Sequence, residues 1–399
     1  MVEYNATLVY NPSISKNHVI GGFYMSSVNR KNYLDNIRWI TILLVVIFHV
    51  FFYYNNIGVA PMFKGLTDNP LDEGKVATVT VAGTYQYAVY QWFMLLLFVI
   101  SGISARYSLE NKTKKEFIRD RARKLLVPST LSVITIQWIG GYLIFLMQFP
   151  QEEVAKIPGF IQYIIWACCG IGALWFCHVL FASCLLLALI KHIDKKDKLL
   201  TLLSKSNIFF VIFLGAVMYL AAQILNMPMI TTYRMCYYPL AFLLGYYVFS
   251  HEKVLDLLKK WGFMFLVIGI VFGVVYFYLF YGTYYAEYEV LNHPVSVAYA
   301  YFTVLGILGV GQHVLNFSNS FTVYMRKAGW GIYICHIFVL LLTNTLLIPV
   351  VSVVPMAVIY IIELVAALLL SILLWEVLKR VPLIRWLLFG IKKEVSSKK

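Results

Sequence analysis

The first segment of the chain that is long enough to cross a membrane carries two basic side chains that could do chemistry together. Arg38 and His49 are the only basic residues in the apolar stretch 37–54. Ionisable groups at membrane depth are costly, which makes them candidates for a functional site. From Arg38 to His49 an α-helix rotates about its axis by about 1100°, which is about 20° more than three full turns. Both side chains therefore project from one face of the helix.

The depth of the two side chains suggests different roles. Between Arg38 and His49 a helix rises about 16 Å, which puts a cation at one membrane face and an imidazole well inside. A hydroxyl is a poor nucleophile while it keeps its proton, and imidazole can remove that proton near neutral pH. Asp35 precedes Arg38 by three residues, so the two can pair where the helix begins. The alternative for His49 is a neutral ring that is hydrogen-bonded within the helix bundle.

A second basic cluster lies at a membrane face. The run Lys112–Lys124 leads into an apolar segment and ends with Arg121, Arg123 and Lys124. Three cations in four residues would bind a phosphorylated cofactor, and Arg38 could hold the same anion from its own helix. The alternative is general, because any cytoplasmic segment of a membrane protein tends to be basic.

Other polar side chains in apolar segments are pocket candidates by the same cost argument. They are His178, Arg234, His336 and Glu363. Arg234 and Glu363 could each instead neutralise another buried charge. The Cys–His pairs at 177–178 and 335–336 suggest a metal, but adjacent helical residues point about 100° apart and no further ligand has suitable spacing. We therefore expect no metal site.

Composition indicates a polytopic all-α membrane protein. Of the 399 residues 61% are hydrophobic and 13% charged, and the mean hydropathy is +0.75. A soluble domain has about twice that share of charges. We predict about ten transmembrane helices. They cover roughly residues 36–55, 86–106, 126–147, 174–190, 207–225, 234–249, 261–281, 295–315, 330–348 and 355–377.

The net charge of +14 is distributed as in a membrane protein rather than a nucleic-acid-binding one. With the N-terminus in the cytoplasm, all but four Lys and Arg residues lie on the cytoplasmic side. The exceptions are Lys64, Lys75, Lys156 and Arg234. This predicts cytoplasmic termini, a multi-pass protein of the plasma or inner membrane, and contact of the basic side with anionic lipid or an anionic ligand. We expect no nucleic acid partner.

The chain divides into three parts. Residues 1–30 are a polar tail, either a disordered segment or the result of a true start at Met25. Residues 31–378 form the membrane domain, and residues 379–399 form a basic cytoplasmic tail.

Six short motifs in order resemble those of the acyltransferase-3 family of integral-membrane O-acyltransferases. They are Tyr33–Arg38 followed by His49, Phe98–Gly102, Arg121–Pro128, Leu174–Phe176, Tyr238–Gly245, and Tyr333 with His336. The resemblance covers about residues 31–377. One departure is Lys124, where the family more often has Arg; ammonium and guanidinium bind phosphate differently.

This resemblance implies transfer of an acyl group, often acetyl, from cytosolic acyl-CoA to a hydroxyl of a carbohydrate or related cell-surface acceptor. Arg38, Arg121 and Lys124 would then hold the phosphates, Arg123 could assist, and His49 would act in the transfer as base or transient nucleophile. Trp175, in the fourth-span motif, joins the pocket candidates. Some family members carry a soluble domain that finishes the transfer. Here the resemblance implies one of two cases: the membrane part transfers alone, or a separate extracytoplasmic partner completes the transfer.

Two other hypotheses stay open at this point. The first is a carrier or flippase of a lipid-linked or polyanionic substrate, for which the basic mouth would be a vestibule. The second is a membrane sensing subunit without catalysis. The pairing of Arg38 with His49 favours the enzyme.

Overall fold

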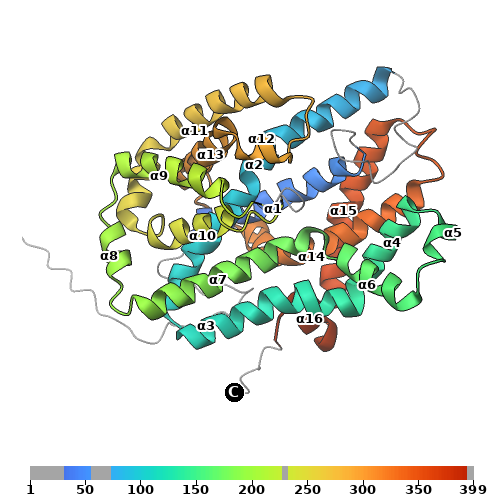
Figure 1. Cartoon of the computed structure of the whole chain (residues 1–399), viewed down its shortest axis with the longest axis horizontal. Coiled ribbons are helices and arrows are strands. Elements are labelled where there is room, and N and C mark those ends of the chain that lie inside the picture. Colours follow the sequence, from blue (N-terminus) through green and yellow to red (C-terminus); the bar gives the residue numbers. More distant parts are fainter. Residues whose placement is uncertain (1–30, 55–72, 227–231, 393–399) are drawn as a thin grey trace, which may run out of the picture.

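A computed structural model describes residues 31–54, 73–226 and 232–392, and no strand occurs in these ranges. The predicted all-α bundle is confirmed (Figure 1). The predicted tail 1–30 and residues 393–399 lie outside the described residues.

Within these described ranges, eight helices are long and apolar enough to cross a membrane. They include α1 (Asn32–Phe52), α2 (Glu73–Glu110), α7 (Trp175–Ile193), α11 (Glu252–Phe280), α13 (Pro294–Val314), α14 (Ser320–Leu347) and α15 (Met356–Leu378). The eighth is one kinked rod made of α3 (Lys114–Arg121), two π-helical turns (Ala122–Leu131 and Val133–Gln137) and α4 (Trp138–Gln148).

Two of the predicted spans are shorter in the structure than a membrane requires. The segment 207–225 holds α9 (Ile208–Ala222, 15 residues), and 234–249 holds α10 (Tyr237–Tyr247, 11 residues). An 11-residue helix rises about 16 Å, about half of a bilayer core. With these two, each of the ten predicted spans contains a helix within the described ranges.

The remaining helices are short, and α6 packs alongside α4 (Figure 1). They are α5 (Gln151–Val154), α6 (Gly159–Cys169), the 3₁₀ turn Gly172–Leu174, α8 (Lys198–Leu203), α12 (Tyr288–Asn292) and α16 (Pro382–Phe389).

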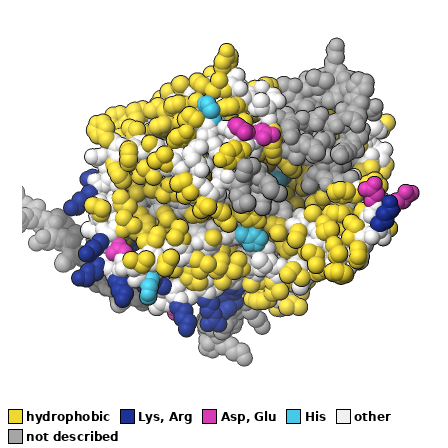
Figure 2. Space-filling view, in the orientation of Figure 1, with side chains coloured by type: hydrophobic (Ala, Val, Ile, Leu, Met, Phe, Trp, Pro, Cys, Tyr) yellow, Lys and Arg dark blue, Asp and Glu magenta, His cyan; other side chains and the backbone are white. Residues whose placement is uncertain are grey.

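One end of the bundle carries most of its cations, and we call it the basic end. Lys31, before α1, forms an ion pair of 2.6 Å with Glu252 at the start of α11, and Arg326 of α14 donates to Asn32. The last described residues also reach this end, where Ile391 lines a pocket with Asp35. Figure 2 shows Lys and Arg along its lower and left edge, and mainly hydrophobic side chains between the two ends. The first and last described segments therefore share one end, as cytoplasmic termini require.

The π-helical turns of the kinked rod have a local cause. Pro128 has no N–H to donate, so the helix around it cannot keep its regular bonding. The hydroxyls of Ser129 and Ser132 donate to the carbonyls of Leu125 and Pro128 and satisfy part of the loosened backbone. At the other end of the rod, Thr113 and Glu116 form a capping box that fixes where α3 begins. These features set the position of Arg121 and Lys124.

Helices α11 and α13 approach each other closely through glycines. A Cβ on Gly309 would lie 2.1 Å from the carbonyl oxygen of Leu258 and 2.5 Å from Cα of Gly262. Small residues at such positions let helices pack in lipid, where the hydrophobic effect does not drive association. This pair anchors the side of the bundle against which α1 and α2 pack.

We expect Gly309→Ala to destabilise the protein by about 1–3 kcal/mol, because backbone of α11 must move to admit the methyl group. Gly159→Ala is the control, since a Cβ there meets nothing within 4 Å. Thermal unfolding in detergent measures both. Equal midpoints for Gly309→Ala and wild type would contradict the close packing of α11 and α13.

Candidate functional site

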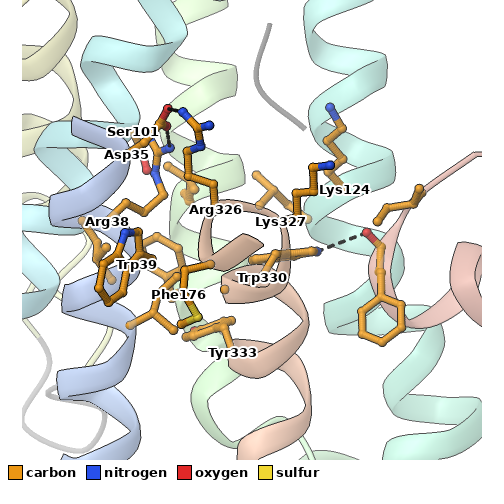
Figure 3. Close-up of a pocket in the computed structure, with 18 of the residues that line it drawn as sticks. Asp35, Arg38, Trp39, Ser101, Lys124, Phe176, Arg326, Lys327, Trp330 and Tyr333 are labelled. Atoms are coloured by element: carbon orange, nitrogen blue, oxygen red, sulfur yellow. Dashed lines mark hydrogen bonds and ion pairs between the residues drawn. The ribbon is translucent and has the colours of Figure 1, made fainter. Parts of the chain in front are cut away.

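A pocket opens at the basic end of the bundle between α1, α3, α14 and α16 (Figure 3). It encloses about 1160 Å³ of empty space, part of it open to solvent. Among the described residues that line it, five are cations and one is an acid, Asp35. The cations are Arg38, Arg121, Lys124, Arg326 and Lys327. This excess of positive charge in a partly enclosed space attracts anions.

Asp35 links two of these cations. Its carboxylate accepts from Arg38 at 3.1 Å and lies 3.7 Å from Arg326 (Figure 3). Arg38 also donates to Ser104 of α2 at 2.6 Å. The pairing of Asp35 with Arg38 at the start of the helix follows the sequence prediction. The contact with Arg326 fixes α14 beside α1 as well.

The kinked rod contributes the second group of cations. Arg121 is 4% exposed and stands over the ring of Phe117, while Lys124 is held by Asp120 at 2.9 Å. The sequence analysis gave Arg123 a role in binding the ligand, but the structure does not bring it to the pocket. It is not among the residues that line the pocket, and its guanidinium pairs with Asp120 instead. Asp120 thus orients Lys124 from the side away from the pocket.

Two cations were missed by the sequence analysis. Arg326 and Lys327 follow the start of α14 and face the same pocket (Figure 3). Their only sequence signal was a basic pair at the cytoplasmic end of a predicted span, and such pairs are common in membrane proteins.

The two predicted histidines on α1 and α14 lie deeper and face each other. Nε2 of His336 is 3.4 Å from Nδ1 of His49, and the ring of Tyr333, which lines the pocket, is 5.8 Å from the ring of His336. The same two helices therefore carry the cations at the mouth and the imidazoles beyond it.

The hydrogen bonds of these rings fix where their protons are. A carbonyl only accepts, so Nδ1 of His49 donates to Val45 at 2.8 Å and Nδ1 of His336 donates to Tyr333 at 2.7 Å. Nε2 of His336 then carries a lone pair and lies 3.4 Å from Nδ1 of His49, whose single N–H is directed at the Val45 carbonyl. No described residue donates to Nε2 of His49, which leaves that nitrogen as the basic one.

A profile of the acyltransferase domain matches residues 31–376. The chain belongs to the acyltransferase-3 family. No curated protein and no solved structure matches it. The match covers nearly all of the described helices, so the protein is a membrane acyltransferase with several transmembrane helices.

In this acyltransferase, Trp175 and His178 lie away from the basic pocket. His178 uses both ring nitrogens: Nε2 donates to the carbonyl of Ser129 at 2.9 Å, and Nδ1 accepts from Tyr233 at 3.5 Å. The first of these hydrogen bonds satisfies a backbone carbonyl in the π-helical part of the rod. Trp175 contacts the rings of Tyr233 and Tyr238. The structure gives both residues a role in packing α7 against its neighbours.

Arg234 and Glu363 are buried in separate places. Arg234 is 3% exposed and donates to the carbonyl of Leu291 at 3.0 Å. Its guanidinium carbon lies 3.8 Å from the centre of the Tyr237 ring. Glu363 is fully buried and accepts from Tyr54 at 3.2 Å and Thr343 at 2.8 Å. Neither forms an ion pair with a described residue.

Among the described residues, no group of three or more His, Cys, Asp or Glu side chains could hold a metal ion. The Cys–His pairs do not come together with a further ligand.

Lys327→Gln should weaken binding of inorganic pyrophosphate by about fivefold, because it removes a solvent-accessible cation from the pocket without disturbing Asp35. Isothermal titration calorimetry of the purified protein in nanodiscs measures it. Lys115→Gln is the matched control: that residue is an exposed lysine of α3 outside the pocket. Equal losses in the two variants would show that the pocket does not gather the anion.

Proposed function

We propose that this acyltransferase moves an acyl group, most simply acetyl, from cytosolic acyl-CoA to a hydroxyl of a carbohydrate or related cell-surface acceptor, in the plasma or inner membrane. The observation that carries the proposal is the arrangement on α1 and α14. These two helices place anion-binding cations at the mouth and a basic imidazole nitrogen deeper in the bundle.

This arrangement suits the chemistry of acyl-CoA. The donor has phosphate groups at one end and a thioester at the end of a long flexible arm. Phosphates at Arg38, Arg121, Lys124 and Lys327 would leave the arm directed past Tyr333 toward the two histidines. Arg38 and Arg121 can hold phosphate by two parallel hydrogen bonds, whereas Lys124 acts as a point charge.

The transfer step uses Nε2 of His49. In a direct transfer the acceptor hydroxyl gives its proton to Nε2 while its oxygen bonds to the thioester carbonyl carbon. The C–S bond then breaks, and the CoA thiolate leaves and takes up a proton. In a two-step transfer, Nε2 itself first bonds to the carbonyl carbon, the C–S bond breaks, and the CoA thiolate leaves and takes up a proton. The acceptor oxygen then bonds to that carbon as the N–C bond breaks, and the hydroxyl proton passes to the released Nε2. The carbonyl of Val45, which accepts from Nδ1–H of His49, and the lone pair of His336 nearby would stabilise positive charge on that ring.

The proposal extends to the surroundings of the enzyme. The acceptor would reach His49 from the end of the bundle opposite the basic one, as a carbohydrate or lipid-linked glycan. Anionic lipids would contact the basic end. A separate extracytoplasmic protein could complete the transfer to a distant acceptor.

We expect His49→Gln to lower release of free CoA thiol from acetyl-CoA by about a hundredfold or more, because general bases contribute at least that much. Purified wild-type and variant proteins in nanodiscs are compared, with the acceptor supplied as a membrane extract. His192→Gln is the matched control, since it removes an exposed imidazole at the end of α7. Thermal unfolding confirms that each variant is folded.

Equal thiol release by folded His49→Gln and wild type would contradict the assigned role. A wild-type protein that moves a lipid-linked substrate across the membrane without any thiol release or acylated product would favour the carrier hypothesis.

A further inference from the structure

The pocket has one wall that the family match does not include. The match ends at residue 376, whereas Phe389 and Ile391, at the end of α16, line the pocket. The sequence analysis treated this part of the chain only as a basic tail. In the structure it returns to the bundle and contacts the cation-bearing helices.

Three contacts fix the segment in place. The ring of Phe389 is fully buried and lies 4.7 Å from that of Trp375, at the end of α15. The indole N–H of Trp330 donates to the carbonyl of Phe389 at 3.1 Å, as the dashed line from Trp330 in Figure 3 marks. Gly390 has φ +64°, and a Cβ there would lie 2.3 Å from the carbonyl oxygen of Arg123. Only glycine fits this turn easily.

The chemistry of this wall differs from that of the rest of the mouth. Phe389 and Ile391 are apolar, and the same segment holds the indole of Trp330, which also lines the pocket. Cations on α1, α3 and α14 can take the phosphates of a ligand. An aromatic and aliphatic wall suits an uncharged part of the same ligand, by burying apolar surface and by stacking.

A helix that merely rests on the membrane surface would have no such contacts. The apolar side chain of Leu383, on the first turn of α16, is 70% exposed and fits that description. The end of α16 at Phe389 is different from a helix resting on the surface, because it is buried, borders the pocket and accepts a hydrogen bond from Trp330.

We propose that residues 389–391, at and just after the end of α16, complete with Trp330 the part of the donor site that binds the uncharged portion of a phosphate-bearing donor, and thereby set its affinity. This inference rests on the proposed function, in which the donor is acyl-CoA. It adds a specificity-determining segment that lies after the matched domain. Ile391 and Trp330 are its binding residues, and Phe389, whose ring is buried against Trp375, is the positioning residue that holds them at the pocket.

The test compares two probes, CoA and inorganic pyrophosphate, by isothermal titration calorimetry on the full chain in nanodiscs. Phe389→Ala should weaken CoA binding by about tenfold and change pyrophosphate binding less than about twofold. Gly390→Ala, which displaces the turn without removing a side chain from the pocket, should also weaken CoA selectively. Leu383→Ala is the matched control on the same helix and should bind both probes like the wild type.

The outcomes separate this inference from the proposed function. A wild-type protein that binds pyrophosphate but not CoA would overturn the proposed donor. A wild-type protein that binds CoA, with Phe389→Ala and Gly390→Ala binding it equally well, would overturn the inference alone. Equal losses for both probes would also overturn it, because the segment would then act only by arranging the cations.

Discussion

The carboxylate of Asp35 is the interaction on which the arrangement of the site depends. It lies between the guanidinium groups of Arg38 on α1 and Arg326 on α14, and so joins helices from opposite ends of the chain. Unpaired, these two cations would repel each other in a partly desolvated space. With Asp35 between them, the helices can approach, and the histidines farther along the same two helices meet. The pocket still has more cations than acids among its described lining residues, and this net positive charge attracts an anionic ligand.

The bundle accommodates this polar interior by satisfying it locally. Each imidazole donates to a carbonyl of its own helix, and Glu363 accepts from Tyr54 and Thr343. Buried polar groups in lipid are costly unless they have such partners. The irregular π-helical turns around Pro128 follow the same rule, because serine hydroxyls and His178 take up loosened carbonyls.

The sequence predicted the helix bundle well and the site in part, for physical reasons. Hydropathy identifies apolar helices of any length, but it did not reveal that α10 has only 11 residues. Helix periodicity placed Asp35, Arg38 and His49 correctly on one helix. Depth alone cannot tell which neighbour a side chain faces, so Trp175 and His178 were grouped with pocket residues that they do not join. The ion pair of Arg123 with Asp120, three residues earlier on the same rod, was not predicted, although this spacing is the sequence signal that could have found it.

The most direct test of the central claim is a cryo-electron microscopy structure of the protein with CoA bound in nanodiscs. The account predicts phosphate density between Arg121, Lys124 and Lys327, with the pantetheine arm passing Tyr333 toward His49. Density for CoA elsewhere on the protein, or an arm that points away from the two histidines, would contradict it.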